Sequence, residues 1–226
     1  MMNNIIKTTP KLGYDRYLIK TDLVTEKNTV EEVVSKYGGS FIENGDILVL
    51  AESVVAISQG RAIPVDKIKI SVLAKILWRF VTRNPSGIGL RSPTSMQCAI
   101  DESGGLRIVI AAIFGGITKL FGKSGIFYRI AGMQAATIDA AFTSPVEPYD
   151  KCVIKGPKNP NKVASDIAAR FNIQAAVMDI NDIGGSWVLG ASNDVDRELL
   201  SRIMLDNPMG QGKQMTPLCL LRKKRT

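Results

Sequence analysis

The sequence predicts an α+β fold with irregular mixed or antiparallel sheets and several helices. Short apolar runs of strand length and amphipathic stretches of helical spacing both occur, but they do not alternate regularly. Regular alternation is typical of parallel α/β sheets, so its absence argues against a Rossmann fold. The length of 226 residues and the apolar content of 45% fit a single globular domain over 1–226. We expect a core at about 14–221 and a basic tail at 222–226.

Four helices are expected from apolar side chains that recur every three or four residues. In the first of them, Val30, Val33 and Val34 form the apolar stripe and a glycine pair follows. The last begins at an N-cap residue, either Asn193 or Asp194. The expected ranges are 29–37, 71–81, 161–171 and a stretch that follows 193 or 194.

Five strands are expected from short apolar or β-branched runs bounded by turn residues. They are 47–51, 53–57, 126–130, 173–180 and 216–221. The apolar run 107–122 is ambiguous between strand and helix. The glycine-rich stretch 84–89 is interpreted as a plain connector, although it could also face a phosphate.

The composition excludes several classes of chemistry. The chain has no histidine, which excludes Ser-His-Asp and Cys-His nucleophiles within one chain and every His-ligated metal site. Cys98, Cys152 and Cys219 are odd in number and far apart, which argues against a disulfide framework or a zinc site and favours a reducing cytoplasm.

Charge and hydropathy point to an anionic partner that is not a membrane. The net charge is +8, which favours anionic ligands. The most apolar run, 108–117, is far shorter than the roughly 20 residues needed to span a bilayer. Residues 1–11 also lack the apolar run of a targeting segment. We therefore expect a cytoplasmic protein with no membrane partner.

The end of the predicted strand 173–180 is the first candidate site. Asp179, Asn181 and Asp182 lie there, followed by two glycines. Ligands often bind at the carboxyl ends of strands, and hard cations such as Mg²⁺ and Mn²⁺ prefer oxygen ligands. The alternative is a turn in which Asn181 and Asp182 satisfy backbone groups.

Asp139 is the second candidate, because it stands alone in an apolar segment. An acid in such a segment is often buried, and burial requires a partner. A metal ion, an arginine or backbone amides would each satisfy it.

The third candidate is the loop that precedes the last predicted strand. Its two glycines allow backbone amides to approach phosphate oxygens, and Lys213 adds a positive charge. A plain connection between two elements is the alternative. The candidate segment is 206–217, and it contains Met209, Gly210, Gln211, Gly212, Lys213, Gln214, Met215 and Thr216.

Two weaker candidates contain carboxylates beside predicted elements. Glu52 and Ser53 follow the strand 47–51, where the simpler interpretation is an exposed strand end. Glu102 is interpreted as a solvated helix end.

Taken together, these segments resemble the gamma-glutamyl ligases of the coenzyme F-420 pathway (coenzyme F-420-0:L-glutamate ligase). The similarity extends from about residue 14 to 221, and the order and spacing of the motifs make it specific. The motifs are IKTDLVT at 19–25, NGDILV at 44–49, SQGR at 58–61, TIDA at 137–140, NDIGG at 181–185 and MGQG at 209–212 with Pro217. The segments MQCAIDE at 96–102 and FYRIAG at 127–132 are similar to those of a bacterial, ligase-like branch.

The resemblance implies an unusual α+β fold, an intertwined homodimer and GTP-dependent amide bond formation with L-glutamate. It implies one or two Mg²⁺ or Mn²⁺ ions and assigns metal ligation to Asp139, Asp182 and Gln211. Nucleotide contacts fall on Glu52, Ser53 and residues 209–216, and the acceptor is expected to be anionic. We expect the dimer interface to include part of the apolar segment 107–130.

Four positions depart from the family pattern. Ile57 stands where a nucleotide-contacting lysine is expected, Phe142 replaces an asparagine, Ile183 replaces a metal-ligating threonine, and neutral Gln211 replaces a glutamate. Lys213 or Arg61 could supply the missing charge, and Asp179 or Glu52 the missing ligand.

These departures leave two alternatives to the ligase. One is a non-ligase paralogue that keeps the fold and binds an anionic nucleotide or cofactor. The other is a nucleic-acid-binding protein, which rests on the net charge of +8 and the basic tail at 222–226, because no recognised nucleic-acid-binding motif is present.

Overall fold

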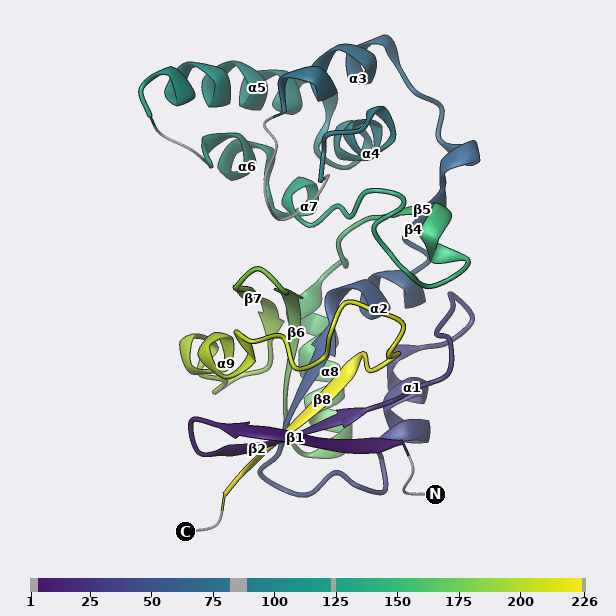
Figure 1. Cartoon of the computed structure of the whole chain (residues 1–226), viewed down its shortest axis with the longest axis vertical. Helices are drawn as coiled ribbons and strands as arrows, with labels where there is room; N and C mark the ends of the chain where they lie inside the picture. The colour runs from purple at the N-terminus through teal and green to yellow at the C-terminus, as the bar shows by residue number, and fades with distance from the viewer. Residues whose placement is uncertain (1–3, 82–88, 123–124, 225–226) are drawn as a thin grey trace. The chain divides into compact units, whose positions relative to one another are not determined.

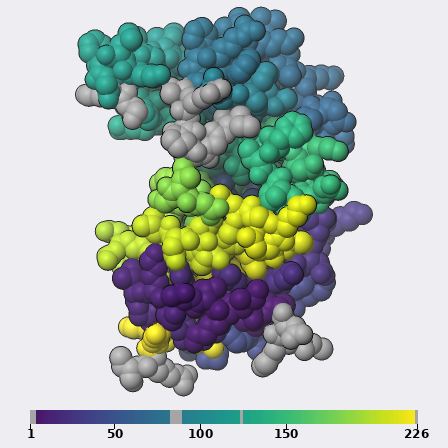
Figure 2. Space-filling model, in the orientation of Figure 1, coloured from purple at the N-terminus to yellow at the C-terminus, as the bar shows by residue number. Residues whose placement is uncertain are grey.

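The computed structural model describes residues 4–81, 89–122 and 125–224, which fold into two compact units. Unit 1 comprises Met1–Gly60 and Pro157–Thr226, and unit 2 comprises Arg61–Gly156 (Figure 1). The two ends of the chain therefore meet in one unit, where purple N-terminal and yellow C-terminal residues adjoin (Figure 2). Of the glycine-rich stretch 84–89, residues 84–88 lie outside the described part of the chain.

Unit 1 is built on a six-stranded mixed sheet with the order β1-β2-β8-β3-β6-β7. β3 and β6 are parallel, and the other neighbours pair antiparallel, which confirms the predicted α+β class with a mixed sheet. The strands are β1 (Ile5–Lys11), β2 (Tyr14–Ile19), β3 (Ile47–Ala51), β6 (Gln174–Asn181), β7 (Gly185–Ala191) and β8 (Leu218–Lys223).

Helices pack on both faces of this sheet. Leu48 and Leu50 belong to one core cluster with Ile167, whereas Val49 belongs to the other with Leu200. This alternation follows from the two-residue period of a strand. Because β3 is buried on both faces, every one of its positions is apolar, which explains the continuous apolar run at 47–51. The helices are α1 (Val30–Tyr37), α2 (Glu52–Ser58), α8 (Pro160–Phe171) and α9 (Arg197–Met204).

Unit 2 is mainly helical and has its own core, which includes Met96, Ile108 and Val153. Its two strands, β4 (Ala62–Pro64) and β5 (Cys152–Ile154), pair antiparallel. The helices are α3 (Val72–Leu77), α4 (Pro93–Ser103), α5 (Gly105–Leu120), α6 (Ile126–Ala131) and α7 (Met133–Ala136), with 3₁₀ turns η1 (Val65–Lys67), η2 (Trp78–Phe80) and η3 (Tyr149–Lys151). Within the described ranges no single helix is long and apolar enough to cross a membrane. Helices α4 and α5 reach the necessary length and hydropathy only when taken together, and the chain bends by 115° between them.

Most of the predicted elements are confirmed to within a few residues. The helices expected at 29–37, 71–81 and 161–171 correspond to α1, to α3 with η2, and to α8. The strands expected at 47–51, 173–180 and 216–221 correspond to β3, β6 and β8. The ambiguous run 107–122 is helical, as α5.

Three local predictions are wrong. Residues 53–57 belong to helix α2, where Val55 and Ile57 are buried, so tertiary packing overrides the β-branched composition. Residues 126–130 form helix α6, which packs closely on α5 because Gly115 leaves room for Phe127. The last helix is capped by Asp196 rather than by residue 193 or 194, since the Asp196 carboxylate accepts a hydrogen bond from Leu199 N at 2.9 Å.

A clamp between Arg16 and Asp206 fixes the start of the loop that leads from α9 to β8. The buried Arg16 guanidinium donates to both Asp206 carboxylate oxygens, at 2.6 and 2.9 Å, and to Ile203 O at 3.0 Å. Hydrogen bonds from Arg16 hold the pKa of the Asp206 carboxyl well below its ordinary value, against the opposing effect of burial, and Lys11 adds to the lowering.

Gly190 of β7 lies against the first residues of α8. A Cβ at this position would lie 2.2 Å from the Pro160 carbonyl carbon and 2.3 Å from Asn161 N. We expect Gly190→Ala to destabilise unit 1 by about 2 kcal/mol or more, because the clash is with backbone that cannot rotate away. Gly116→Ala is the control, since a Cβ there meets nothing within 4 Å. Urea unfolding, followed by Trp187 fluorescence in a Trp78→Phe background, gives the unfolding midpoint of each variant. Equal midpoints for Gly190→Ala and Gly116→Ala would refute the predicted clash.

The Arg16–Asp206 clamp predicts a dependence of stability on pH. A carboxyl whose pKa is lowered by folding stabilises the fold above its unfolded pKa of about 3.9, and this contribution is lost as the pH falls below that value. We expect the urea midpoint of the wild type to fall from about pH 5 to pH 3, and Asp206→Asn to show a lower midpoint at pH 7 and a smaller slope. The same slope in both proteins would contradict the assignment.

Candidate functional site

Three of the predicted candidate segments meet at one edge of the sheet in unit 1. Because β3 and β6 are parallel and Ala51 pairs with Met178, the carboxyl end of β3, followed by Glu52, lies beside Asp179, and β6 continues to Asn181 at the same edge. The antiparallel β8 begins there, since Ala51 N donates to Pro217 O at 2.9 Å. Segments 52–53, 179–182 and 209–216 therefore converge, at the kind of edge where α/β sheets place ligands.

The turn between β6 and β7 separates the roles of Asn181 and Asp182. Asn181 Oδ1 accepts hydrogen bonds from Ile183 N at 3.2 Å and Gly185 N at 2.8 Å, so Asn181 stabilises the turn as the alternative interpretation expected. The Asp182 carboxylate instead accepts from Asn207 Nδ2 at 2.6 Å. Asp182 therefore faces the loop that precedes β8.

Gln211 joins this loop to the hairpin. Its side-chain oxygen accepts from Asp182 N at 3.3 Å, and its Nε2 donates to Ile180 O at 3.5 Å. Asp182 and Gln211, two of the three metal ligands that the resemblance implies, therefore lie together in unit 1, 29 residues apart in sequence.

The loop 209–216 is anchored at both ends and exposed in the middle. At its start, Gly210 N donates to Asn207 Oδ1 at 3.1 Å, and Thr216 Oγ1 donates to Met209 O at 2.7 Å. At its end, Met215 O accepts from Thr21 N at 2.9 Å. Residues 210–214 are exposed between these anchors.

The Gln214 side chain lies over the two glycines of the loop. A Cβ at Gly210 or at Gly212 would lie 2.7 Å from an atom of the Gln214 amide. Gly210 also requires its positive φ of 72°, whereas Gly212 has only the movable end of Gln214 as a close neighbour. Removal of this amide would open the loop backbone to a ligand.

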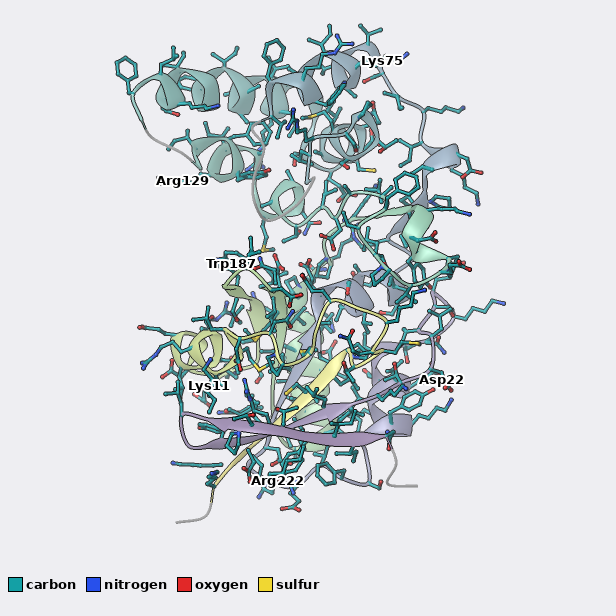
Figure 3. All side chains as sticks on the ribbon, in the orientation of Figure 1. Lys11, Asp22, Lys75, Arg129, Trp187 and Arg222 are labelled. Atoms are coloured by element: carbon teal, nitrogen blue, oxygen red, sulfur yellow. The ribbon has the colours of Figure 1, made fainter. Side chains whose placement is uncertain are left out.

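Asp179 and Trp187 face each other across the β6–β7 hairpin, where they are register partners. Burial raises the pKa of the Asp179 carboxyl. Trp187 is half-exposed and projects from β7 (Figure 3), with its ring beside Gly185. Trp187 was not among the residues predicted from the sequence, and Asn207 lay within the candidate segment 206–217 without a predicted role, although its Asn-Pro dipeptide is a turn signal.

Glu52 and Ser53 occupy the first turn of α2. The interpretation of Glu52 as an exposed strand end is wrong, because its side chain is buried at the start of a helix. Ser53 is half-buried beside it.

Asp139 belongs to unit 2 and lies at its surface, so the expectation of a buried carboxylate is wrong. The backbone of Asp139 pairs with Ile154 through hydrogen bonds of 2.8 and 3.1 Å. Its neighbours Ile138 and Ala140 are buried. The alternation of an extended segment therefore turns the intervening carboxylate outward.

Arg61 lies in a buried network within unit 2. Its guanidinium donates to Gly156 O, to Glu102 Oε2 at 2.8 Å and to Gln134 Oε1 at 2.9 Å, while Lys155 Nζ donates to Glu102 Oε1 at 3.0 Å. Glu102 is therefore not a solvated helix end. Burial favours its neutral form, but the bonds from Arg61 and Lys155 lower its pKa overall. Arg61, the first residue of unit 2, thereby links the start of this unit to its last residue, Gly156.

The sheet edge of unit 1 carries oxygen atoms of the kind that hard cations prefer. Within the described residues no three His, Cys, Asp or Glu side chains cluster closely enough to hold a metal ion. In unit 1 the Gln211 amide oxygen accepts from the Asp182 backbone N, and the Asp182 carboxylate accepts from Asn207 Nδ2. Two oxygen donors supplemented by water or phosphate oxygens match the usual environment of Mg²⁺.

Comparison with known proteins gives one significant result. No curated protein matches the chain. The family model described as F420-0:Gamma-glutamyl ligase matches residues 18–192, a range that includes all of unit 2 and the strands of unit 1 from the end of β2 through β7. The chain therefore belongs to the F420-0:gamma-glutamyl ligase family.

Proposed function

We propose that the protein is a GTP- and divalent-metal-dependent ligase that joins L-glutamate, or a similar amine, to a carboxylate acceptor. The observation that supports this most directly is the meeting of Asp182, Gln211 and the loop 209–216 at the carboxyl ends of β3 and β6. Membership of the family supports the ligase class.

The proposed reaction has two steps. The acceptor carboxylate takes the γ-phosphoryl group of GTP, which forms an acyl phosphate and releases GDP. The amine of glutamate then attacks the acyl carbon, loses a proton and displaces inorganic phosphate, which leaves an amide. A bound Mg²⁺ or Mn²⁺ neutralises charge on the phosphates.

Each residue at the edge has a proposed part. Asp182 and Gln211 supply oxygen ligands to the cation. The exposed backbone of residues 210–214 binds the phosphate chain, and Lys213 provides a positive charge. Glu52, Ser53 and Asp179 support the nucleotide or the metal. Self-association as a homodimer is part of the proposal.

A non-ligase paralogue that binds a nucleotide is the second candidate. Ile57, at the position of the expected lysine, is buried in α2, so it offers a nucleotide neither charge nor surface. Ile183 and Phe142, which replace polar residues, are exposed. Neutral Gln211 weakens cation binding relative to a glutamate.

Glutamate-dependent turnover distinguishes the two candidates. We expect the wild type, given GTP, Mn²⁺ and coenzyme F-420-0, to release phosphate at least tenfold faster when L-glutamate is present. Calorimetry should show GTP binding that requires Mn²⁺. Binding without glutamate-dependent release would favour the paralogue, and no binding of either GTP or ATP would contradict the proposal.

Gly212→Val tests the role of the loop in the same assays. We expect this variant to lose at least tenfold in GTP affinity, because a side chain blocks the approach of phosphate to the backbone. Its urea midpoint should not change, since only the end of Gln214 must move. Gly116→Val, in open space on α5, is the matched control and should bind GTP normally.

A further inference from the structure

Trp187 and Asp179 are neighbours on one face of the β6–β7 hairpin. The two residues are register partners, and side chains directly opposite each other in an antiparallel pair lie on the same face, with Cβ atoms roughly 5 Å apart. β7 is the last strand in the order of the sheet, and Trp187 is 53% exposed there. Unit 1 therefore presents an aromatic ring and a carboxylate together at one edge.

Gly185 and Asn181 set the position of the Trp187 ring. A Cβ at Gly185 would lie 2.3 Å from Trp187 Cη2 and 2.5 Å from Asn181 Nδ2, so the ring occupies space that a side chain would otherwise fill. Asn181 is itself fixed, because its Oδ1 accepts hydrogen bonds from Ile183 N and Gly185 N. The ring is therefore held beside the hairpin backbone, although more than half of the residue remains exposed.

Asp179 differs from the other carboxylates whose pKa changes on folding. Hydrogen bonds from partners lower the pKa of carboxyls such as Asp15, Asp22 and Asp206, whereas burial alone raises the pKa of the Asp179 carboxyl. Among the described residues none donates a hydrogen bond to this carboxylate or forms an ion pair with it. A half-buried charge without a partner is destabilising, and a cation that binds to it would offset this effect.

The alternation of β6 separates Asp179 from the proposed metal ligands. Ile180 packs in the core cluster that contains Met209, so the side chain of Asp179, one position earlier, lies on the opposite face of the strand. The Asp182 carboxylate accepts from Asn207, which belongs to the same loop as Met209. Asp179 is therefore not positioned as a third ligand beside Asp182.

Of the three proposed substrates, only the amine carries a positive charge at its reacting end. The triphosphate of GTP and the carboxylate of the acceptor are anionic, so the charge of Asp179 would repel both. A protonated amine is attracted to a carboxylate through charge-assisted hydrogen bonds and to the face of a tryptophan ring through a cation–π interaction. The pair of side chains matches an ammonium group in both respects.

We propose that Asp179 and Trp187 bind the ammonium group of the amine substrate. This proposal rests on the proposed function, and it changes the part of Asp179 from support of the nucleotide or the metal to binding of the amine. The ammonium group donates hydrogen bonds to the Asp179 carboxylate and lies against the exposed Trp187 ring. Because Asp182 belongs to the same hairpin, the amine is held near the edge at which the acyl phosphate forms.

Fluorescence of Trp187 tests this binding without turnover. In a Trp78→Phe background, Trp187 is the only tryptophan of the chain. We expect L-glutamate to change its emission in a saturable way, without nucleotide or acceptor, and methylammonium to do so at higher concentration. Glutarate, which has both carboxylates of glutamate but no amine, is the control and should bind at least tenfold more weakly. No change with L-glutamate or methylammonium, or equal affinity for glutamate and glutarate, would overturn the proposal.

Two pairs of variants, compared by calorimetry, locate the contact. Asp179→Asn keeps the shape of the side chain but removes its charge and should weaken L-glutamate binding at least tenfold, whereas Asp194→Asn, at an exposed position of unit 1, should not. Trp187→Leu should weaken binding about tenfold, and Trp187→Phe, which keeps an aromatic face, should retain most of the affinity. Equal affinities within either pair would contradict the proposed contact.

Asp179→Asn also separates the amine site from a metal site and from the proposed function. This variant should bind Mn²⁺ as the wild type does; a loss of Mn²⁺ affinity as large as the loss of glutamate affinity would overturn the proposal. Hydroxylamine, which is mostly uncharged at neutral pH, should trap the acyl phosphate as a hydroxamate equally well in both proteins, and a loss in Asp179→Asn alone would contradict an amine-binding role. Absence of hydroxamate in both proteins would refute the proposed function, whereas the glutamate titration would still decide whether the amine site exists.

Discussion

The parallel pairing of β3 with β6 is the constraint on which the candidate site depends. Two parallel strands end at the same edge of a sheet, so the residues that follow each of them must lie together. The antiparallel β8, which pairs with β3 on its other side, brings the preceding loop to the same edge. The register therefore brings the residues that follow Ala51 and Met178 close to Pro217. The hydrogen bonds among Asp182, Asn207 and Gln211 then hold the hairpin and the loop together.

Much of the fold could be predicted from the sequence, because local patterns decide it. The continuous apolar run of β3 indicates a strand that is buried on both faces, and the spacing of Val30, Val33 and Val34 indicates α1. Segments 53–57 and 126–130 could not be predicted, because both have β-type compositions and are helical through their packing. The motifs also indicated the family, which the family match confirms.

The candidate site was less accessible to prediction, because its contacts are between residues far apart in sequence. Nothing local indicates that Gln211 bonds to the Asp182 backbone or that Asn207 binds the Asp182 carboxylate. Nor does the sequence show that Glu102 is paired with Arg61 and Lys155. Carboxylates near turns and helix ends are usually solvated, so only tertiary structure distinguishes a largely buried acid such as Glu102 from an exposed one such as Asp139.

Binding of Mn²⁺ by the wild type and by Asp182→Asn tests the central claim most directly. Asparagine keeps an oxygen that can accept the hydrogen bond from Asn207 but removes the charge that a hard cation prefers. Electron paramagnetic resonance of free Mn²⁺, titrated with protein and GTP, should show at least tenfold weaker binding by Asp182→Asn. Asp194→Asn, elsewhere in unit 1, should bind as the wild type does. Equal affinity in all three proteins would show that the edge formed by β3 and β6 is not the metal site.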